Sequence, residues 1–358
     1  MAKALFLKED NPFLTRQVLG KPLIYFPVKE AKKVIEQVYV SGFNVDFAEE
    51  KDFHSVEEIF AEMEEDEKLL FAYPSFIGIF AEDIVDALNK GSCLFIIEGE
   101  IAGGVIKKGE KIENVKKKVE IEGVKIRDNF SFVDAVHLIR FRIIEEAMLK
   151  GAIILDPYTT WIDEDVEFSP EVTVEPNVIL KGWIKLEEDV VIKSFTYMEN
   201  GGKEGRMPEK PMVVRKGASI GPFSRLRLDS EIGEGVFIGN FVEVKKSKIG
   251  KNVKAQHLTY IGDAEIGEDS NIGAGTITCN YDGVKKNKTK IGSRVFVGSG
   301  VELVAPVEVE DDVYIAAGST ITERVPRFSL AIARARQINK EGWVLKKRKE
   351  WQEKSKES

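Results

Sequence analysis

The sequence contains few cysteines and histidines, no long apolar run and no excess of positive charge. Its two cysteines, Cys93 and Cys279, lie far apart and supply neither a disulfide framework nor a paired metal motif. No stretch approaches the ~20 apolar residues that a membrane span needs, and the start, MAKALFLKED, lacks the apolar run of a signal peptide. The net charge of −8 leaves room for a local cationic patch but disfavours a general nucleic-acid binder. We therefore expect a cytoplasmic protein that binds neither membranes nor nucleic acids.

Two parts of the chain differ in the spacing of their apolar residues. With 358 residues, the chain is long enough for about two domains of ~150 residues each. From about Trp161 onward, an apolar residue recurs every six positions, first at Ile162, Phe168, Val174, Leu180, Leu186 and Ile192. A second apolar residue follows four positions after the first five of these, at Val166, Val172, Val178, Ile184 and Val190. The six-residue spacing returns between residues 214 and 238, at 266–272 and from 291 to 321.

This spacing matches neither an amphipathic helix, with its period of 3.6, nor a simple strand, with its period of 2. It indicates a β-helix, in which short strands alternate with tight corners and one side chain per hexad points to the axis. Gly, Asp and Asn follow the inward residue in IGED, IGKN and IGEG, where corners need a permissive backbone. A sandwich of short hairpins is the alternative, and so many hexads in phase disfavour it.

The first part of the chain lacks the period and predicts a small α/β domain over residues 1–130. Helices are expected at 28–42 and 55–67, and strands at 68–74 and 92–106. A linker helix is expected over 131–152, with Ser131 and Asp134 as its capping box. The β-helix should then occupy 153–326, followed by a C-terminal arm and a charged, frayed tail over 327–358.

Three polar stretches interrupt the hexads at 221–230, 239–267 and 271–292. Their runs GNFVE, HLTYIGDAEIG and NIGAGTITCNYDG, with KEGW near the end of the chain, resemble a known enzyme family. It is the bacterial bifunctional N-acetylglucosamine-1-phosphate uridyltransferase/glucosamine-1-phosphate acetyltransferase family, and the resemblance is to its acetyltransferase half. It covers roughly residues 131–343 and is most specific over 221–283.

The resemblance implies a fold, an assembly and a reaction. The fold is a left-handed parallel β-helix of hexapeptide repeats after a degenerate nucleotidyltransferase-like α/β domain, and the assembly is a homotrimer with sites between subunits. The reaction moves the acetyl group of acetyl-CoA to glucosamine 1-phosphate, in the pathway to UDP-N-acetylglucosamine, peptidoglycan and lipopolysaccharide. The stretch after Thr278 would be a loop extruded from the coil that helps to build the acetyl-CoA site.

His257, in HLTY, is the expected general base. A lone histidine is usually structural, but here the surrounding match favours catalysis. An aminosugar is protonated near neutral pH, and its ammonium group cannot attack a thioester. An imidazole whose unperturbed pKa is ~6.5 can accept that proton, so no covalent enzyme intermediate is needed.

The resemblance also assigns binding residues. Arg227 and Lys245 match the positions that bind the sugar phosphate, a role that suits a guanidinium fork and an ammonium group. Arg225 is a chemical rival to Arg227 without a role in the motif. The sugar-contacting positions are matched by Tyr260 and Asn271.

A second set matches the family's acetyl-CoA positions. Its members are Ala274, Asn280, Tyr281, Ser299, Ala317 and Arg334. The alanines can offer only backbone groups and space, and a backbone N–H near the thioester can stabilise the developing oxyanion. Arg334 suits a CoA phosphate, with Arg336 as its rival. Cys279 is interpreted as a wall residue, and no metal is expected for acetyl transfer.

Two stretches of the chain imitate or replace phosphate-binding loops. The family's uridyltransferase half opens with LxxGxGTRM, whereas this chain has LFLKEDNPFLTRQVLGKPL, and FAYPSF stands where a metal-binding GD pair is expected. The front domain is therefore interpreted as catalytically dead. GGKEGRMPEK, at 201–210 within a wider insertion at 194–213, lacks the strand–GxxxxGK[ST]–helix pattern and is interpreted as a surface excursion.

Three other functions compete with this one. The same chemistry on another aminosugar phosphate, such as galactosamine 1-phosphate, differs by only a few loop contacts. A non-catalytic scaffold would need none of His257, Lys245, Arg227 and Asn280. Retained uridyltransferase activity would make the protein bifunctional, and the missing glycines disfavour it.

Overall fold

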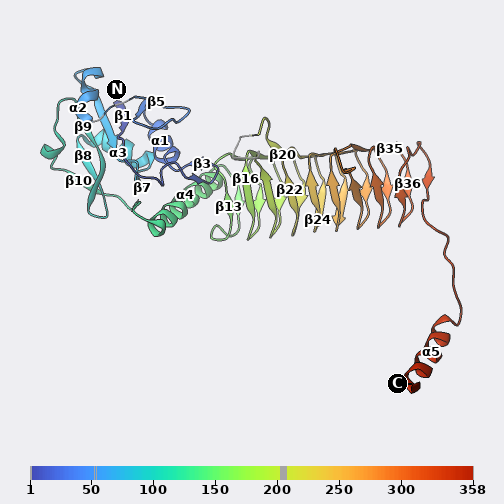
Figure 1. Cartoon of the computed structure of the whole chain (residues 1–358). Helices are drawn as coiled ribbons and strands as arrows, with labels where there is room; N and C mark the ends of the chain where they lie inside the picture. The colour runs from blue at the N-terminus through green and yellow to red at the C-terminus, as the bar shows by residue number, and fades with distance from the viewer. Residues whose placement is uncertain (1, 52, 54, 202–207, 358) are drawn as a thin grey trace.

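The computed structural model describes residues 2–51, 53, 55–201 and 208–357. Figure 1 shows an α/β domain at the N-terminus, a connecting helix, a long β-helix and a C-terminal arm. Most of the stretch expected to be a surface excursion, residues 202–207, lies outside the described residues.

The front domain is built on a seven-stranded mixed sheet. Across the sheet lie β10 (Lys118–Glu120), β8 (Cys93–Ile97), β9 (Glu100–Lys107), β6 (Lys68–Ala72), β1 (Ala2–Phe6), β4 (Gln37–Val40) and β5 (Glu49–Glu50). The central pairs of β1 with β4 and β6 are parallel, and β9 runs antiparallel to its neighbours β6 and β8. The other elements are α1 (Tyr25–Lys32), α2 (Val56–Ile59), α3 (Ala81–Lys90), the 3₁₀ turns η1 (Phe60–Glu62) and η2 (Ile112–Asn114), and the strand pairs β2 (Gln17–Val18) with β3 (Lys21–Pro22) and β7 (Phe76–Ile77) with β11 (Val124–Lys125).

Two helix predictions in this domain were too long. The helix expected over 28–42 ends at Lys32, because Val38 and Val40 are buried in strand β4 beside β1. The acidic helix expected over 55–67 is one α-turn and one 3₁₀ turn. In both stretches, packing on the sheet overrides the helix-forming composition.

Helix α4 (Asn129–Leu149) joins the two parts, and its cap differs from the prediction. Asp128 is the N-cap and its carboxylate accepts the backbone N–H of Ser131, while the Ser131 hydroxyl oxygen accepts the N–H of Asp128. Ser131 is thus the third helical residue rather than the cap. Farther along, the buried guanidinium of Arg140 donates to the carbonyl oxygens of Pro157, Tyr158 and Thr160 at 3.2, 2.9 and 2.9 Å, which fixes α4 on the first coil.

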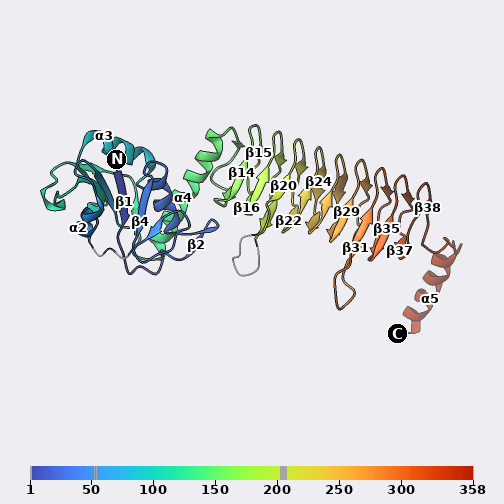
Figure 2. The ribbon, with the colours of Figure 1, turned by 90° about the horizontal axis from the view of Figure 1, so that it is seen from above.

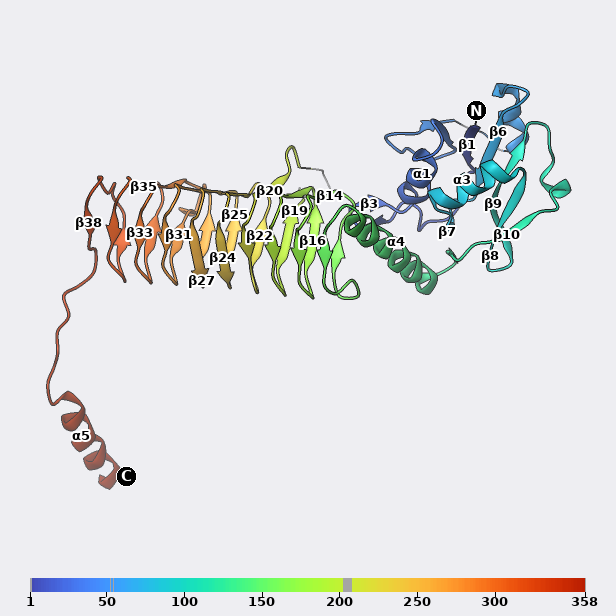
Figure 3. The ribbon, with the colours of Figure 1, turned by 180° about the vertical axis from the view of Figure 1, so that it is seen from behind.

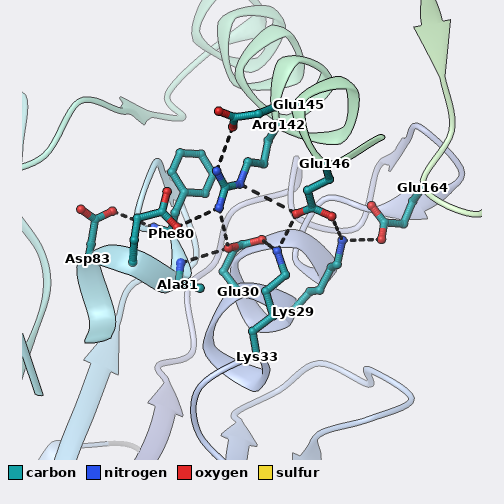
Figure 4. A network of polar contacts seen from close by, with 11 residues as sticks. Lys29, Glu30, Lys33, Phe80, Ala81, Asp83, Arg142, Glu145, Glu146 and Glu164 are labelled. Atoms are coloured by element: carbon teal, nitrogen blue, oxygen red, sulfur yellow. Dashed lines mark hydrogen bonds and ion pairs between the residues drawn. The ribbon is translucent and has the colours of Figure 1, made fainter. Parts of the chain in front are cut away.

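An ion-pair network joins the front domain, α4 and the first coil (Figure 4). Lys29 Nζ lies 2.6 Å from Glu164 of the first coil and 3.4 Å from Glu146 of α4. On the other side, Arg142 of α4 contacts Glu30 of α1 at 3.9 Å. Burial raises the pKa of Glu164, against the effect of its contact with Lys29. The three parts of the molecule therefore meet at partly buried charges and not at a bare linker.

The β-helix has three parallel sheets, here called sheets I, II and III, which the chain visits in turn on each coil (Figure 2). Sheet I contains β12 (Ile153–Ile154), β15 (Thr173–Val174), β18 (Val191–Ile192), β21 (Ser219–Ile220), β24 (Phe237–Asn240), β27 (Lys254–His257), β30 (Asn271–Ile272), β33 (Phe296–Val297), β36 (Tyr314–Ile315) and β38 (Leu330–Ala331). Sheet II contains β13 (Trp161–Ile162), β16 (Ile179–Gly182), β19 (Tyr197–Asn200), β22 (Arg225–Arg227), β25 (Glu243–Lys245), β28 (Tyr260–Gly262), β31 (Ile277–Cys279), β34 (Glu302–Val304) and β37 (Thr320–Ile321). Sheet III contains β14 (Val166–Phe168), β17 (Ile184–Leu186), β20 (Met212–Val214), β23 (Glu231–Ile232), β26 (Lys248–Ile249), β29 (Ala264–Ile266), β32 (Thr289–Ile291) and β35 (Val307–Val309).

The predicted fold class, a left-handed β-helix behind an α/β domain, is confirmed. The inward series forms one continuous core, in which Ile162, Leu180 and Ile192 have no exposed surface. Because neighbouring strands of a sheet lie ~4.8 Å apart, equivalent residues of successive coils stack in columns along the axis.

The corner between sheets I and II changes character halfway along the β-helix. Its first part presents exposed Phe195, Phe223, Phe241 and Leu258, here called the corner ladder, all with φ between 49° and 61°. The ring centroids of the phenylalanines lie 4.8 and 5.5 Å apart. Bulky residues rarely adopt a positive φ, so this apolar stripe is held against a backbone preference. In the following coils, Gly275, Gly300 and Gly318 occupy the same corner.

The outer face of sheet III has a different chemistry. One outward-facing residue from each of five successive coils forms a column on this face, since each member pairs in register with the next. The members alternate between negative and positive charge. The members are Glu231, Lys248, Glu265, Lys290 and Glu308. Opposite charges on neighbouring strands stabilise a sheet that faces water.

After Ala331 the chain leaves the β-helix, and α5 (Trp343–Glu357) stands away from the body (Figures 1 and 3). The expectation of a frayed tail was wrong, since Lys, Arg, Glu and Gln are good helix formers in this segment. Within the described residues, no helix combines the length and apolar character needed to cross a membrane.

Candidate functional site

Residues 280–288 leave the coil between β31 and β32 as a protruding loop (Figure 2). The N–H of Asn287 donates to the carbonyl of Asn280 at 2.7 Å and closes the base of the loop. Asp282 holds the tip, because its carboxylate accepts the N–H groups of Val284 and Lys285 at 2.9 and 2.8 Å. Backbone hydrogen bonds from these two residues lower the pKa of Asp282 to about 2. The regular repeat therefore stops for an organised loop.

Three cations gather on the outer face of sheet II. Arg227 and Lys245 hold equivalent positions in neighbouring coils, since Leu226 pairs with Val244 just before them. The ammonium group of Lys286, from the loop, lies beside that of Lys245. The contact with Lys286, the burial of Lys245 and the charge of Arg227 together lower the pKa of Lys245 to about 8. Such a cluster of like charges suits a dianion, which would remove the repulsion. Lys286 was missed in the sequence, where nothing separates it from the other two lysines of the loop, Lys285 and Lys288.

The start of the loop is anchored beside this cluster. Asn280 is only 7% exposed, and its side-chain N–H donates to Asp263 at 2.6 Å and lies 3.4 Å from Tyr260 Oη. A Cβ on Gly262 would collide with Tyr260 Oη and come within 2.8 Å of the Asn280 amide. Glycine at 262 therefore lets Tyr260 and Asn280 lie together on the face that presents Lys245.

His257 lies at the end of a sheet I strand, exposed, one coil before Ala274. Ala255 pairs in register with Ile272. The residues two positions after them, His257 and Ala274, therefore occupy equivalent positions in neighbouring coils. The column continues through Ser299 and Ala317 in the next two coils. Because these side chains are small and the neighbouring corner residues are glycines, this edge of the β-helix carries no bulky side chain along the column.

The remaining predicted residues lie at the ends of this site. Arg334 is exposed just past the last sheet I strand, with its Cδ 3.8 Å from the place of a Cβ on Gly318. Tyr281 is exposed on the loop and donates its hydroxyl to the carbonyl of Gly283 at 2.6 Å. Asn271 faces outward from sheet I, whereas Lys245 faces outward from sheet II. The outer faces of two sheets that meet at a corner turn away from each other, so one chain does not bring Asn271 and Lys245 together.

Arg225, the rival to Arg227, also points outward from sheet II, where its neighbours in register are Tyr197 and Glu243. Arg227 donates to Glu243 at 2.8 Å, and its charge also lowers the pKa of Lys245. Cys279 forms part of the sheet II wall, where burial raises its pKa. In the described part of the chain, no three His, Cys, Asp or Glu side chains are grouped to hold a metal ion.

Comparisons with known proteins find relatives by sequence. The family model for the bacterial transferase hexapeptide (six repeats) matches residues 288–323. The bifunctional protein GlmU of Streptococcus thermophilus is 47% identical over 245 residues, which are 67% of this chain and 53% of that protein. GlmU of Acetivibrio thermocellus is 46% identical over 248 residues, covering 68% of this chain and 54% of that one.

Solved structures also match. LpxA, a UDP-N-acetylglucosamine acyltransferase from Bacteroides fragilis, is 16% identical with a TM-score of 0.27 and covers 48% of this chain and 69% of that one. The polySia-specific acetyltransferase NeuO is 18% identical with a TM-score of 0.23, over 58% of this chain and 95% of that one. Scores this low support no comparison of sites. The resemblance predicted from the sequence is confirmed by the curated relatives: over two thirds of its length the chain is similar to the bifunctional GlmU proteins, and it spans about half the length of the relatives that it matches.

Proposed function

We propose that the protein transfers the acetyl group of acetyl-CoA to the amine of glucosamine 1-phosphate, giving N-acetylglucosamine 1-phosphate and CoA. The observation that supports this most directly is a pairing of two sites along one corner. A cluster suited to a phosphate dianion, Arg227, Lys245 and Lys286, lies on sheet II. The exposed His257 lies at the edge of sheet I, in line with the small-residue column at Ala274, Ser299 and Ala317.

His257 accepts a proton from the sugar ammonium group, so that the free amine can attack the thioester carbonyl. A C–N bond forms and the carbonyl oxygen gains negative charge, which a backbone N–H beside Ala274 can stabilise. The C–S bond then breaks, the nitrogen gives up its second proton to become the neutral amide, and the departing CoA thiolate takes up a proton to become the free thiol. The small residues after His257 leave room for an elongated cofactor along the axis, with Asn280 and Tyr281 at its acetyl end and Arg334 at its phosphate end.

The active unit is a homotrimer built on the corner ladder. Asn271 on sheet I and Lys245 on sheet II can contact one sugar only if they come from different copies. Parallel copies that meet at exposed Phe195, Phe223 and Phe241 place sheet I of one chain opposite sheet II of the next. The alternating charges of sheet III then remain in water, and the acetyl-CoA groove lies between copies.

The front domain does not transfer uridylyl groups. In open α/β sheets, ligands bind beyond the carboxyl ends of parallel strands, here β1 and β6. Glu9 occupies this place, where its carboxylate accepts the N–H and hydroxyl of Ser75 at 2.7 and 2.8 Å. A fixed carboxylate repels a triphosphate, and the glycines of a phosphate loop are absent.

Assays of the purified protein with acetyl-CoA and either glucosamine 1-phosphate or galactosamine 1-phosphate, followed by release of free thiol, test the proposal. We expect turnover with glucosamine 1-phosphate to exceed that with its epimer. Faster turnover with the galactosamine compound would change the substrate but keep the chemistry. Absence of thiol release with both sugars would overturn the acetyltransferase and leave a scaffold.

A further inference from the structure

Asp263 contacts three separate parts of the site. It follows β28 at the corner between sheets II and III, with φ 51°. Its N–H donates to the carbonyl of Lys245 in the preceding coil at 3.0 Å, and its carbonyl accepts the N–H of Thr289, just after the loop, at 3.2 Å. Its carboxylate accepts the side-chain N–H of Asn280, at the start of the loop, at 2.6 Å. A single residue thus joins both ends of the loop to the coil that contains Lys245.

The charge of Asp263 matters as much as its position. Lys286 and Arg227 both lower the pKa of Lys245, because like charges lie close together here, and this repulsion opposes the contact between the loop and sheet II. The negative charge of Asp263 raises the pKa of Lys245 and so opposes the effect of Lys286. A hydrogen bond to a charged acceptor is also stronger than one between neutral groups.

We infer that Asp263 is a positioning residue that holds the loop 280–288 on sheet II, so that Asn280 and Lys286 stand in place before the sugar phosphate arrives. It does not touch the reacting atoms. The identity of the substrate rests on the proposed function, but the anchoring of the loop does not. The two can therefore be tested apart.

The decisive variant is Asp263→Asn, because asparagine tolerates the positive φ and keeps the shape while removing the charge. Limited proteolysis with trypsin should cut after Lys285, Lys286 or Lys288 about tenfold faster than in the unchanged protein, as a charge-assisted anchor is lost. The matched control is Asp269→Asn. Asp269 also has a positive φ, 58°, and accepts a side-chain amide, that of Asn252 at 2.9 Å, but at the corner between sheets III and I. It should leave the loop's cleavage rate unchanged.

Two further readouts separate positioning from general stability. Inorganic phosphate should slow cleavage of Asp263→Asn more than that of the unchanged protein, because the anion replaces the missing negative charge. In the acetyl-transfer assay, the KM for the aminosugar phosphate should rise about tenfold, with a smaller change in kcat and an unchanged unfolding midpoint.

Equal cleavage rates for Asp263→Asn and the unchanged protein would overturn the inference, whatever the activity. An equal increase in the cleavage rate of the loop in Asp269→Asn would also overturn the inference, since the effect would then be a general loosening of the coils. If the unchanged protein transfers no acetyl group, the proposed function fails, and proteolysis still decides the role of Asp263.

Discussion

His257 and Ala274 occupy equivalent positions in neighbouring coils, because the residues two places before them, Ala255 and Ile272, pair in register. The proposed base therefore lies about one strand spacing, ~4.8 Å, from the first member of the small-residue column. At the same level the corner changes from Leu258 to Gly275. The proposed general base therefore lies at the level where the bulky residues of the corner ladder give way to glycine, which leaves space beside it for an acyl donor.

Replacing His257 with alanine tests the base. Because general-base catalysis contributes ~10²- to 10⁴-fold, kcat near neutral pH should fall by that factor. The KM for acetyl-CoA should change little, since the cofactor contacts lie on other residues. At alkaline pH the loss should shrink, because the amine is then free without help. An unchanged kcat in an intact trimer at neutral pH would show that His257 is not the base.

The small-residue column predicts a steric effect on the cofactor. Ala317→Leu would fill the edge beside Gly318, so the KM for acetyl-CoA should rise ~10-fold or more, with little effect on the KM for the sugar phosphate. The control is Thr320→Leu, which changes another exposed position of the same coil, on sheet II. Equal kinetics for the two variants would place the cofactor elsewhere.

Lys245 predicts how phosphate affinity depends on pH. Lys286, burial and Arg227 lower its pKa to about 8, so its charge is present below pH 8 and lost as the pH rises through that value. An ordinary lysine would keep its charge to ~10.4. The Ki of glucose 1-phosphate, which has no amine to titrate, should therefore rise ~10-fold above pH 8.

Two variants check the cause of this pH dependence. Lys286→Ala should move the rise in Ki toward higher pH, because it removes the main cause of the low pKa. Lys245→Arg should flatten the curve, because arginine stays charged. A flat curve in the unchanged protein would mean that Lys245 does not bind the phosphate.

The β-helix could be predicted from sequence because each hexad places one apolar side chain on the axis, and Ile162, Leu180 and Ile192 are buried as expected. The loop was also expected, from the resemblance. The sequence does not show which lysine of the loop lies beside Lys245, because the position of Lys286 depends on the path of the chain around Asp282. The role of Asp263 was missed too, because its three partners are far apart in sequence.

The errors lie where local pattern and tertiary context disagree. The residues 28–42 have a helical composition, but Val38 and Val40 complete a buried sheet. The capping box of the linker helix was expected at Ser131 and Asp134. The helix begins at Asn129, so Asp128 caps it and Ser131 is the third residue.

The front domain predicts a negative result. With UTP, Mg²⁺ and N-acetylglucosamine 1-phosphate, no UDP-sugar and no pyrophosphate should form above background, because Glu9 and Ser75 close the edge where a triphosphate would bind. A release assay for pyrophosphate measures this directly. Turnover comparable to acetyl transfer would show that a divergent nucleotide site had been mistaken for a closed one.

The corner ladder predicts what holds the copies together. Phe223→Asn together with Phe241→Asn should turn a trimer of about three chain masses into monomers in light scattering, because the stacked apolar surface is lost. Acetyl transfer should fall with the trimer, since Asn271 and Lys245 would no longer face each other. Each chain should remain folded, because asparagine adopts a positive φ more readily than phenylalanine.

The matched control is Phe328→Asn, which changes an exposed phenylalanine with φ 63° outside the ladder. It should leave both the mass and the activity unchanged, because its ring does not stack on Phe223 or Phe241. If the double variant stayed trimeric, the copies would meet at another surface. If it became a fully active monomer, the site would be complete within one chain, and the separation of Asn271 from Lys245 would have to be explained by a sugar that never touches Asn271.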